Sequence, residues 1–171
     1  MFPEPFIWNS ISLEVCIPLI NFIFPDPLID SLFSSGAKTF ISSFPFHING
    51  SGNIQGEGLN CRRMAVSING SGDVRLQQIE SQECQAGISG SGNINLKGKA
   101  IQAKYAIAGS GNIQAADLEA ENTDASISGS GNISCYASQK LVARVKGSGD
   151  IAYKGNPQEV DAPRKNIRQI K

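Results

Sequence analysis

The sequence of 171 residues has no net charge and very little histidine or tryptophan. Lysine and arginine total 15, and aspartate and glutamate total 15. A general basic surface for nucleic acid or anionic lipid is therefore not expected. His47 is the only histidine and Trp8 the only tryptophan. One histidine can assist one serine at most, and we expect His47 to be an ordinary exposed or edge residue.

Paired cysteines and long apolar runs are also absent. The four cysteines form no CxxC pair, and their spacings of 45, 23 and 51 residues match no zinc signature (Cys16, Cys61, Cys84 and Cys135). We expect buried or free thiols, although an even number also permits disulfides. The apolar run "LEVCIPLINFIF" is interrupted by Pro18 and Asn21 and is too short to span a bilayer. No basic region precedes it, so it is a poor secretory signal.

What the sequence does contain is a repeated Gly-Ser-Gly tripeptide. Its first glycine recurs at spacings of 20, 20, 19, 20 and 18 residues. A period near 20 indicates a solenoid rather than an ordinary globular fold. Each closing glycine is followed by asparagine or aspartate. The six corners defined in this way are Gly50, Gly52 and Asn53; Gly70, Gly72 and Asp73; Gly90, Gly92 and Asn93; Gly109, Gly111 and Asn112; Gly129, Gly131 and Asn132; and Gly147, Gly149 and Asp150.

β-Branched aliphatic residues flank every corner, two residues before it and two residues after it. The twelve positions are Ile48, Ile54, Ile68, Val74, Ile88, Ile94, Ile107, Ile113, Ile127, Ile133, Val145 and Ile151. Further apolar residues lie four and six residues before most corners, with polar residues between them. This period of two predicts a strand with one buried face before each corner, and a second short strand after it. A third inward position is expected at Leu59, Ile79, Leu118 and Leu141, with Ile101 as its counterpart in the fourth coil.

These patterns predict an all-β protein, a parallel β-helix of about six coils in a single chain. Equivalent residues of successive coils then lie about 4.8 Å apart, so the twelve aliphatic residues form a core ladder and the Asn/Asp residues a second ladder. Glycine is expected where the corner needs a positive φ or where backbone packs against backbone. The corners are thus interpreted as structural, and no catalytic, cofactor-binding or metal site is assigned.

Ligand-binding interpretations of the corner are less favoured. A phosphate loop requires a lysine after the glycines and a helix beyond them, and neither is present. The calcium-binding repeat of β-rolls has a period of nine. None of the corner serines lies in a G-x-S-x-G elbow.

The composition divides the chain into three parts. Residues 1–41 form an apolar Phe/Pro-rich segment, residues 42–157 the β-helix, and residues 158–171 a polar tail expected to be a loose cap. All eight phenylalanines lie at or before Phe46, whereas 17 of the 18 glycines follow it. Three interpretations of residues 1–41 remain open. The segment covers the apolar end of the first coil, is a remnant or an aberrant start, or associates with a membrane.

The corners, together with the closing stretch "KGSGDIAYKGNP", resemble the putative auto-transporter adhesin family with the head GIN domain. The resemblance covers about residues 42–157. It implies a right-handed β-helix, a location in the bacterial cell envelope or outside the cell, and no established catalytic residues. Family members usually carry a longer N-terminal portion of β structure, which residues 1–41 do not resemble.

Three hypotheses of function follow. The leading one is a non-enzymatic, adhesin-like surface or scaffold protein that binds an unknown ligand, carbohydrate or protein, on its outward faces. The second is a structural β-solenoid that self-associates end to end. The third is a carbohydrate-active enzyme. Neither a cofactor nor a nucleic-acid partner is expected.

Overall fold

The computed structural model describes residues 41–162 and 166–170. Within them the chain forms eleven strands and no helix. The strands are β1 (Ile41–Gly50), β2 (Asn53–Glu57), β3 (Asn60–Gly70), β4 (Asp73–Gly90), β5 (Asn93–Gly109), β6 (Asn112–Gly129), β7 (Asn132–Tyr136), β8 (Lys140–Gly147), β9 (Ile151–Lys154), β10 (Glu159–Asp161) and β11 (Ile167–Gln169). The all-β class predicted from the sequence is confirmed.

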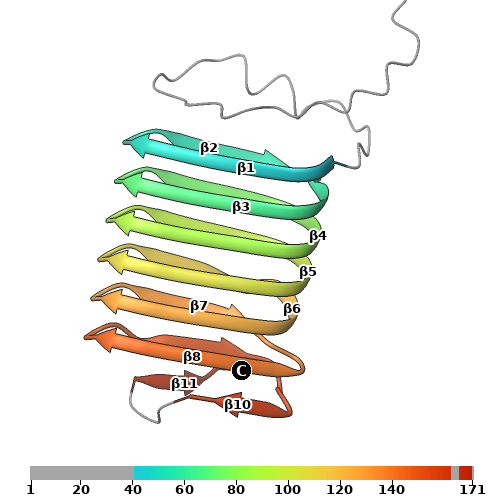
Figure 1. Cartoon of the computed structure of the whole chain (residues 1–171), viewed down its shortest axis with the longest axis vertical. Helices are drawn as coiled ribbons and strands as arrows, with labels where there is room; N and C mark the ends of the chain where they lie inside the picture. Colours follow the sequence, from blue (N-terminus) through green and yellow to red (C-terminus); the bar gives the residue numbers. More distant parts are fainter. Residues whose placement is uncertain (1–40, 163–165, 171) are drawn as a thin grey trace, which may run out of the picture.

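The strands stack into a flattened column in which each coil runs along one side, turns at a Gly-Ser-Gly corner and returns along the other side (Figure 1). Every strand pairs in parallel with its equivalent in the next coil. In Figure 1 the front strands run to the left, the rear strands run to the right and the chain descends, so the β-helix is right-handed.

Register between coils follows the repeat in the sequence. The first glycines of successive corners pair with one another from Gly50 to Gly147. Backbone hydrogen bonding between coils therefore aligns residues that are one period apart, as a solenoid requires. The predicted solenoid of about six coils with a period near 20 is confirmed.

The core is a column of aliphatic side chains between the two sides. Ten of the twelve β-branched residues that flank the corners are 5% exposed or less. Ile54 and Val145 are half-buried. Ile54 lies in the first coil, where no described strand pairs with the outer edge of β2. Val145 lies where the short β10 does not extend over β8, since β10 pairs only with Lys140, Leu141 and Val142.

One large polar residue, Tyr105, fits into this core because its neighbours in the stack are small. Tyr105 pairs with Ala86 in the coil before and with Ala125 in the coil after. The two methyl side chains leave room for the ring, which is 2% exposed. Its hydroxyl group is buried without a hydrogen-bond partner.

The third inward position was predicted wrongly in two coils. Ile101 is 46% exposed. The residue that aligns with Ile79 and Leu118 is Gly98, because irregularities between Leu76 and Ile79 and between Asn95 and Lys97 shift the register in this part of the coil. Leu141 is buried, but not as a third inward position. It pairs with Thr123 in the strand six residues before the corner, which is the other position that its place in the sequence predicts.

The polar tail is more regular than expected. It adds β10, which pairs with β8, and β11, which pairs with β9, so it forms a short further coil rather than a loose cap. The interpretations offered for residues 1–41 concern a segment that, apart from the backbone of Ile41, lies outside the described residues.

Candidate functional site

Backbone conformation and close packing explain the glycines of the corners, and both apply to the first glycine: a Cβ at Gly70 would overlap the carbonyl oxygen of Gly50. The first glycine has a φ between +113° and +152° in all six corners, a backbone conformation that residues with a side chain rarely adopt. From the second corner onward, the closing glycine packs against the coil before it. A Cβ at Gly72 would overlap the carbonyl oxygen of Gly52 and lie 2.9 Å from the γ2 methyl group of Ile48. The same overlap with the preceding coil occurs at Gly92, Gly111, Gly131 and Gly149.

The Asn/Asp residues that follow the corners form a directional ladder of hydrogen bonds. Asn93 Nδ2 donates to Asp73 Oδ1 at 2.9 Å, and Asn112 and Asn132 continue the series at 3.1 Å each. At its ends, backbone N–H groups take over as donors: those of Asp73 and Asp150 donate to Asn53 and Asn132. Most of the Asn/Asp side chains thus form hydrogen bonds with neighbouring coils and do not point freely toward a ligand.

A seventh rung of this ladder was missed in the sequence. Because Ile167 pairs with Ile151, Asn166 aligns with Asp150. Asn166 adopts a φ of 63°, and its Nδ2 donates to the Gly149 carbonyl oxygen at 3.1 Å. The dipeptide Asn-Ile at 166–167 repeats the one after four of the corners, but without a Gly-Ser-Gly before it.

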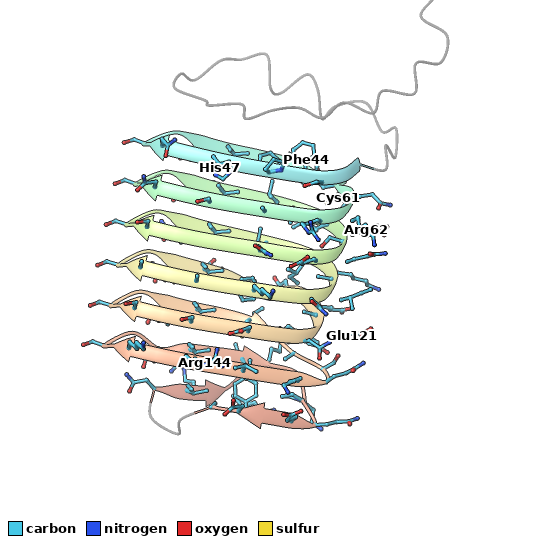
Figure 2. The ribbon with its side chains drawn as sticks, viewed as in Figure 1. Phe44, His47, Cys61, Arg62, Glu121 and Arg144 are labelled. Atoms are coloured by element: carbon cyan, nitrogen blue, oxygen red, sulfur yellow. The ribbon has the colours of Figure 1, made fainter. Side chains whose placement is uncertain are left out.

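The corner serines and His47 remain on the surface. All six serines are exposed, from Ser51 to Ser148. Their backbone N–H groups, from Ser71 onward, donate to the first glycine of the preceding corner at 2.9 or 3.0 Å. His47 is exposed on β1 (Figure 2). The geometry therefore gives the corner a structural role in pairing successive coils.

A groove of about 370 Å³ lies at the opposite edge of the column, where β4, β5 and β6 bend from the rear side to the front. We call it the corner groove because the coils turn here a second time, at the edge away from the Gly-Ser-Gly corners. Its floor is a stack of small side chains from successive coils: Ser81, Ala100, Ala120 and Ser138. Longer side chains rise on both sides of this floor, and Tyr136 completes the lining. Figure 2 shows Glu121 at this edge.

The walls of the corner groove carry three carboxylates, one ammonium group and one exposed aliphatic side chain. Lys99 lies between Glu80 and Glu119 in one column, and its Nζ is 3.9 Å from Glu119 Oε2. Glu121, in the other wall, accepts a hydrogen bond from Gln139 Nε2 at 3.0 Å. Ile101 lies in the same wall. The groove thus offers hydrogen-bond acceptors beside apolar surface, a mixture typical of sites for polar organic ligands.

One polar atom in the lining has no partner. Ser81 Oγ is buried and makes no hydrogen bond. The sequence reasoning missed the corner groove, since no motif marks a column of serine and alanine. The signal was nevertheless present: once the period is known, these small residues align one coil apart.

The strands on the front of the column carry charged pairs between coils. Glu83 is the best connected: Arg63 Nε lies 3.0 Å from Oε2, Lys104 Nζ lies 3.7 Å from Oε1, and Gln85 Nε2 donates to Oε1 at 2.7 Å. Hydrogen bonds from Gln85 and Arg63, helped by the nearby charges, lower the pKa of Glu83 below its usual value. These charges compensate one another across coils and favour the observed register.

The described cysteines are buried and free of disulfides. Burial raises the pKa of Cys84 and of Cys135 to about 12, and it also raises the pKa of Cys61. A thiol that stays protonated at neutral pH is a poor nucleophile and a poor metal ligand. Cys16 lies outside the described residues.

Residues 41–162 and 166–170 contain no group of three or more histidine, cysteine, aspartate or glutamate side chains suited to a metal ion. The same part of the chain has no helix of the length and hydrophobicity needed to cross a membrane.

The corner geometry is repeated along the full column, and the sequence of that column matches a known family. Residues 45–157 match the family described as "Putative auto-transporter adhesin, head GIN domain". The chain belongs to this family. The head GIN match begins within β1 and ends just before β10, so it covers all six Gly-Ser-Gly corners.

Two solved structures are similar to this head GIN protein. A putative lipid-binding protein from Parabacteroides distasonis is 31% identical, with a TM-score of 0.63 over 77% of this chain and 57% of that chain. A putative adhesin from Bacteroides fragilis is 29% identical, with a TM-score of 0.58 over 75% of this chain and 56% of that chain. The chain therefore spans little more than half the length of either structure. No curated protein gives a significant match.

Proposed function

We propose that this head GIN protein is a non-enzymatic β-solenoid of the cell envelope or the secreted fraction, with an adhesin-like role in binding at surfaces. The observation that carries the proposal is the family match, which extends over residues 45–157. A family described as an adhesin head, together with a relative named a putative adhesin, favours a surface location and a binding role.

The corner groove is the proposed binding site. The interior of the column is filled by buried side chains, so a ligand has access to outward faces only. Among these faces the corner groove combines concavity, carboxylates and the exposed Ile101. A carbohydrate or a protein segment fits this mixture of acceptors and apolar surface. A lipid, as the name of the Parabacteroides relative suggests for that protein, would likewise have to bind on the surface.

A catalytic role for the groove is less well supported. A general acid in a glycoside hydrolase is typically a carboxyl group sheltered from water. Glu119 is 62% exposed and lies near Lys99, and Glu121 is exposed and hydrogen-bonded to Gln139. End-to-end polymerisation is not favoured either, because β10 and β11 add only three residues each to the C-terminal end and carry exposed charges there.

Fractionation of the native host, followed by mass spectrometry of the mature N-terminus, tests the location. We expect the protein in the envelope or in the medium. Its recovery only in the cytoplasm, with an intact Met1, would remove the adhesin-like proposal.

An array of defined oligosaccharides tests the binding site. We expect binding by the full chain, loss of binding in Ile101→Lys and Glu121→Lys, and normal binding in the control Gln114→Asp on another face. Release of reducing sugars from a bound oligosaccharide would instead indicate an enzyme. Unchanged binding in both Ile101→Lys and Glu121→Lys would show that the groove is not the site.

A further inference from the structure

The corner groove lies where the backbone hydrogen bonds are used between coils. Glu80, Lys99 and Glu119 pair with one another in successive coils, and so do the floor residues beside them. Below them, the backbone N–H of Ser138 donates to the carbonyl oxygen of Ala120. A peptide that binds by strand addition needs an unpaired strand edge, and the described residues of the groove offer none. A ligand in the groove is therefore recognised by side chains.

The charges that line the corner groove are not balanced. Its carboxylates are those of Glu80, Glu119 and Glu121, and its one ammonium group is that of Lys99. Lys99 Nζ is 3.9 Å from Glu119 Oε2, whereas Glu80 and Glu121 form no ion pair within the described part of the chain. Each of these two carboxylates accepts a hydrogen bond from a neutral side-chain amide instead. Three carboxylates thus share one cation, and a concave surface concentrates their field.

The front strands of the column differ from the groove in this respect. There Arg63 lies 3.0 Å from Glu83, and Arg144 lies 3.6 Å from Asp124. Arg62 is at the same edge as the groove but does not line it (Figure 2). The groove therefore has an excess of negative charge that a cationic ligand would complement.

The other lining groups suit a sugar ring. Ser81 Oγ, in the floor, has no hydrogen-bond partner among the described residues. Carboxylates only accept hydrogen bonds, and the hydroxyl groups of a sugar donate them. Ile101 is 46% exposed and Tyr136 is half-buried, so both offer apolar surface to the face of a ring. The groove thus combines acceptors, a free hydroxyl group and apolar contact.

We propose that the corner groove selects an oligosaccharide that carries protonated amino groups. The inference rests on the proposed function, which places binding in this groove, and it adds the charge of the ligand. An ammonium group on the sugar donates charge-assisted hydrogen bonds to Glu119 and Glu121, which are stronger than those between neutral groups. Lys99 competes with the ligand for Glu119, so it lowers the affinity of the groove for a cation.

Calorimetric titration with two sugars tests the charge of the ligand. The probes are the β-1,4-linked tetramers of glucosamine and of N-acetylglucosamine, in which the acetyl group removes the charge. At about pH 6 glutamate side chains are ionised and the amino groups of glucosamine are protonated. We expect the glucosamine tetramer to bind about fivefold more tightly or better, and about 0.5 M NaCl to weaken its binding. Equal or tighter binding of the neutral tetramer would overturn the proposal, and so would failure of the glucosamine tetramer to bind.

Substitutions that change only charge locate the selection. Glu121→Gln should weaken binding of the glucosamine tetramer about two- to fivefold, and Lys99→Gln should strengthen it by a similar factor. The control Glu57→Gln removes a carboxylate outside the groove lining and should leave binding unchanged. Unchanged affinity in both groove variants, or changes of the opposite sign, would contradict the proposal. An equal loss in Glu57→Gln would show that the net charge of the chain, and not the groove, attracts the sugar.

Ile101→Ser separates this proposal from the proposed function, because it removes apolar surface and no charge. If Ile101→Ser weakens binding of both tetramers and the two sugars bind equally well, the groove is still the binding site but does not select charge. If neither Ile101→Ser nor the charge variants alter the binding of either sugar, the site lies elsewhere and both proposals fail.

Discussion

Ile94 offers the sharpest test of the inward ladder. Its side chain is 0% exposed, and it stacks between Val74 and Ile113 in the middle of the column. Ile94→Asp removes an aliphatic burial that stabilises the fold by about 1.5–3 kcal/mol. It also buries a carboxyl group without a partner, which costs about 2–7 kcal/mol even when the group is neutral.

Together these effects reach about 4–10 kcal/mol, against a total stability of about 5–15 kcal/mol for a domain. We therefore expect Ile94→Asp to unfold the column or to leave it only marginally stable. The measurement is urea unfolding followed by circular dichroism, with the midpoint compared between variants.

Two matched variants separate burial from the chemistry of the substitution. Gln114→Asp introduces the same side chain on the exposed face of the next coil, and we expect a change below about 0.5 kcal/mol. Ile94→Val, which removes only one methylene group, should cost about 0.5–1.5 kcal/mol. If Ile94→Asp and Gln114→Asp unfold at the same urea concentration, the assignment of inward and outward positions is wrong.

Three further predictions concern the core and the asparagine ladder. Tyr105→Phe should raise the melting temperature, because it removes a buried hydroxyl without a partner and gains about 1 kcal/mol; a lower value in calorimetry would point to a hidden partner. Asn93→Asp loses its hydrogen bond to Asp73 and adds a like charge beside it. It should lower the urea midpoint, with partial recovery at high salt; a salt-independent loss would exclude charge repulsion. Burial raises the pKa of Cys84 and Cys135 to about 12, above the ordinary value of 9.0. Their contribution to stability is therefore fully present below pH 9 and is lost as the pH rises toward 12. When both cysteines are replaced by alanine, the loss of stability at high pH should be smaller than in the original chain.

The corners and the strand before each corner were predictable because contacts in a solenoid recur at one fixed separation. Ile88 and Ile107 touch because they are one period apart, so aligning the repeats in the sequence is equivalent to aligning them in space. The fixed distance from each strand to its Gly-Ser-Gly also sets the phase of the inward residues. A single known corner thus places the residues two, four and six positions before it.

The far edge of each coil was harder to predict because no glycine motif fixes its phase. Between Leu76 and Ile79, and again between Asn95 and Lys97, the pairing shifts. The third inward residue lies seven positions after the closing glycine at Leu59, Ile79 and Leu118, but the same count from Gly92 reaches the charged Lys99. The nearby aliphatic residue Ile101 was therefore predicted to lie in the core, whereas the structure leaves it exposed beside the corner groove. The groove lies in this same edge and was missed for the same reason.

The C-terminal coil was missed because it keeps the Asn-Ile dipeptide of the repeat but lacks the Gly-Ser-Gly that precedes it in the other coils. Asn166 and Ile167 continue both ladders, but the Gly-Ser-Gly before them is absent and the step from Asp150 is 16 residues. The polar composition of this coil, which suggested a loose tail, instead reflects strands that face solvent at the end of the column.

The strength of the contacts between coils indicates where a ligand can bind. Along the asparagine ladder five of the six side chains take part in hydrogen bonds of 2.9 to 3.2 Å, so a ligand there has to replace these bonds one for one. In the corner groove Lys99 and Glu119 are 3.9 Å apart and 75% and 62% exposed. Exposed ion pairs of this kind contribute about 0–1 kcal/mol, so a ligand displaces them with little loss. A weak lateral contact thus lies at the concave surface, and this is why we place binding at the groove rather than at the repeated Gly-Ser-Gly corner.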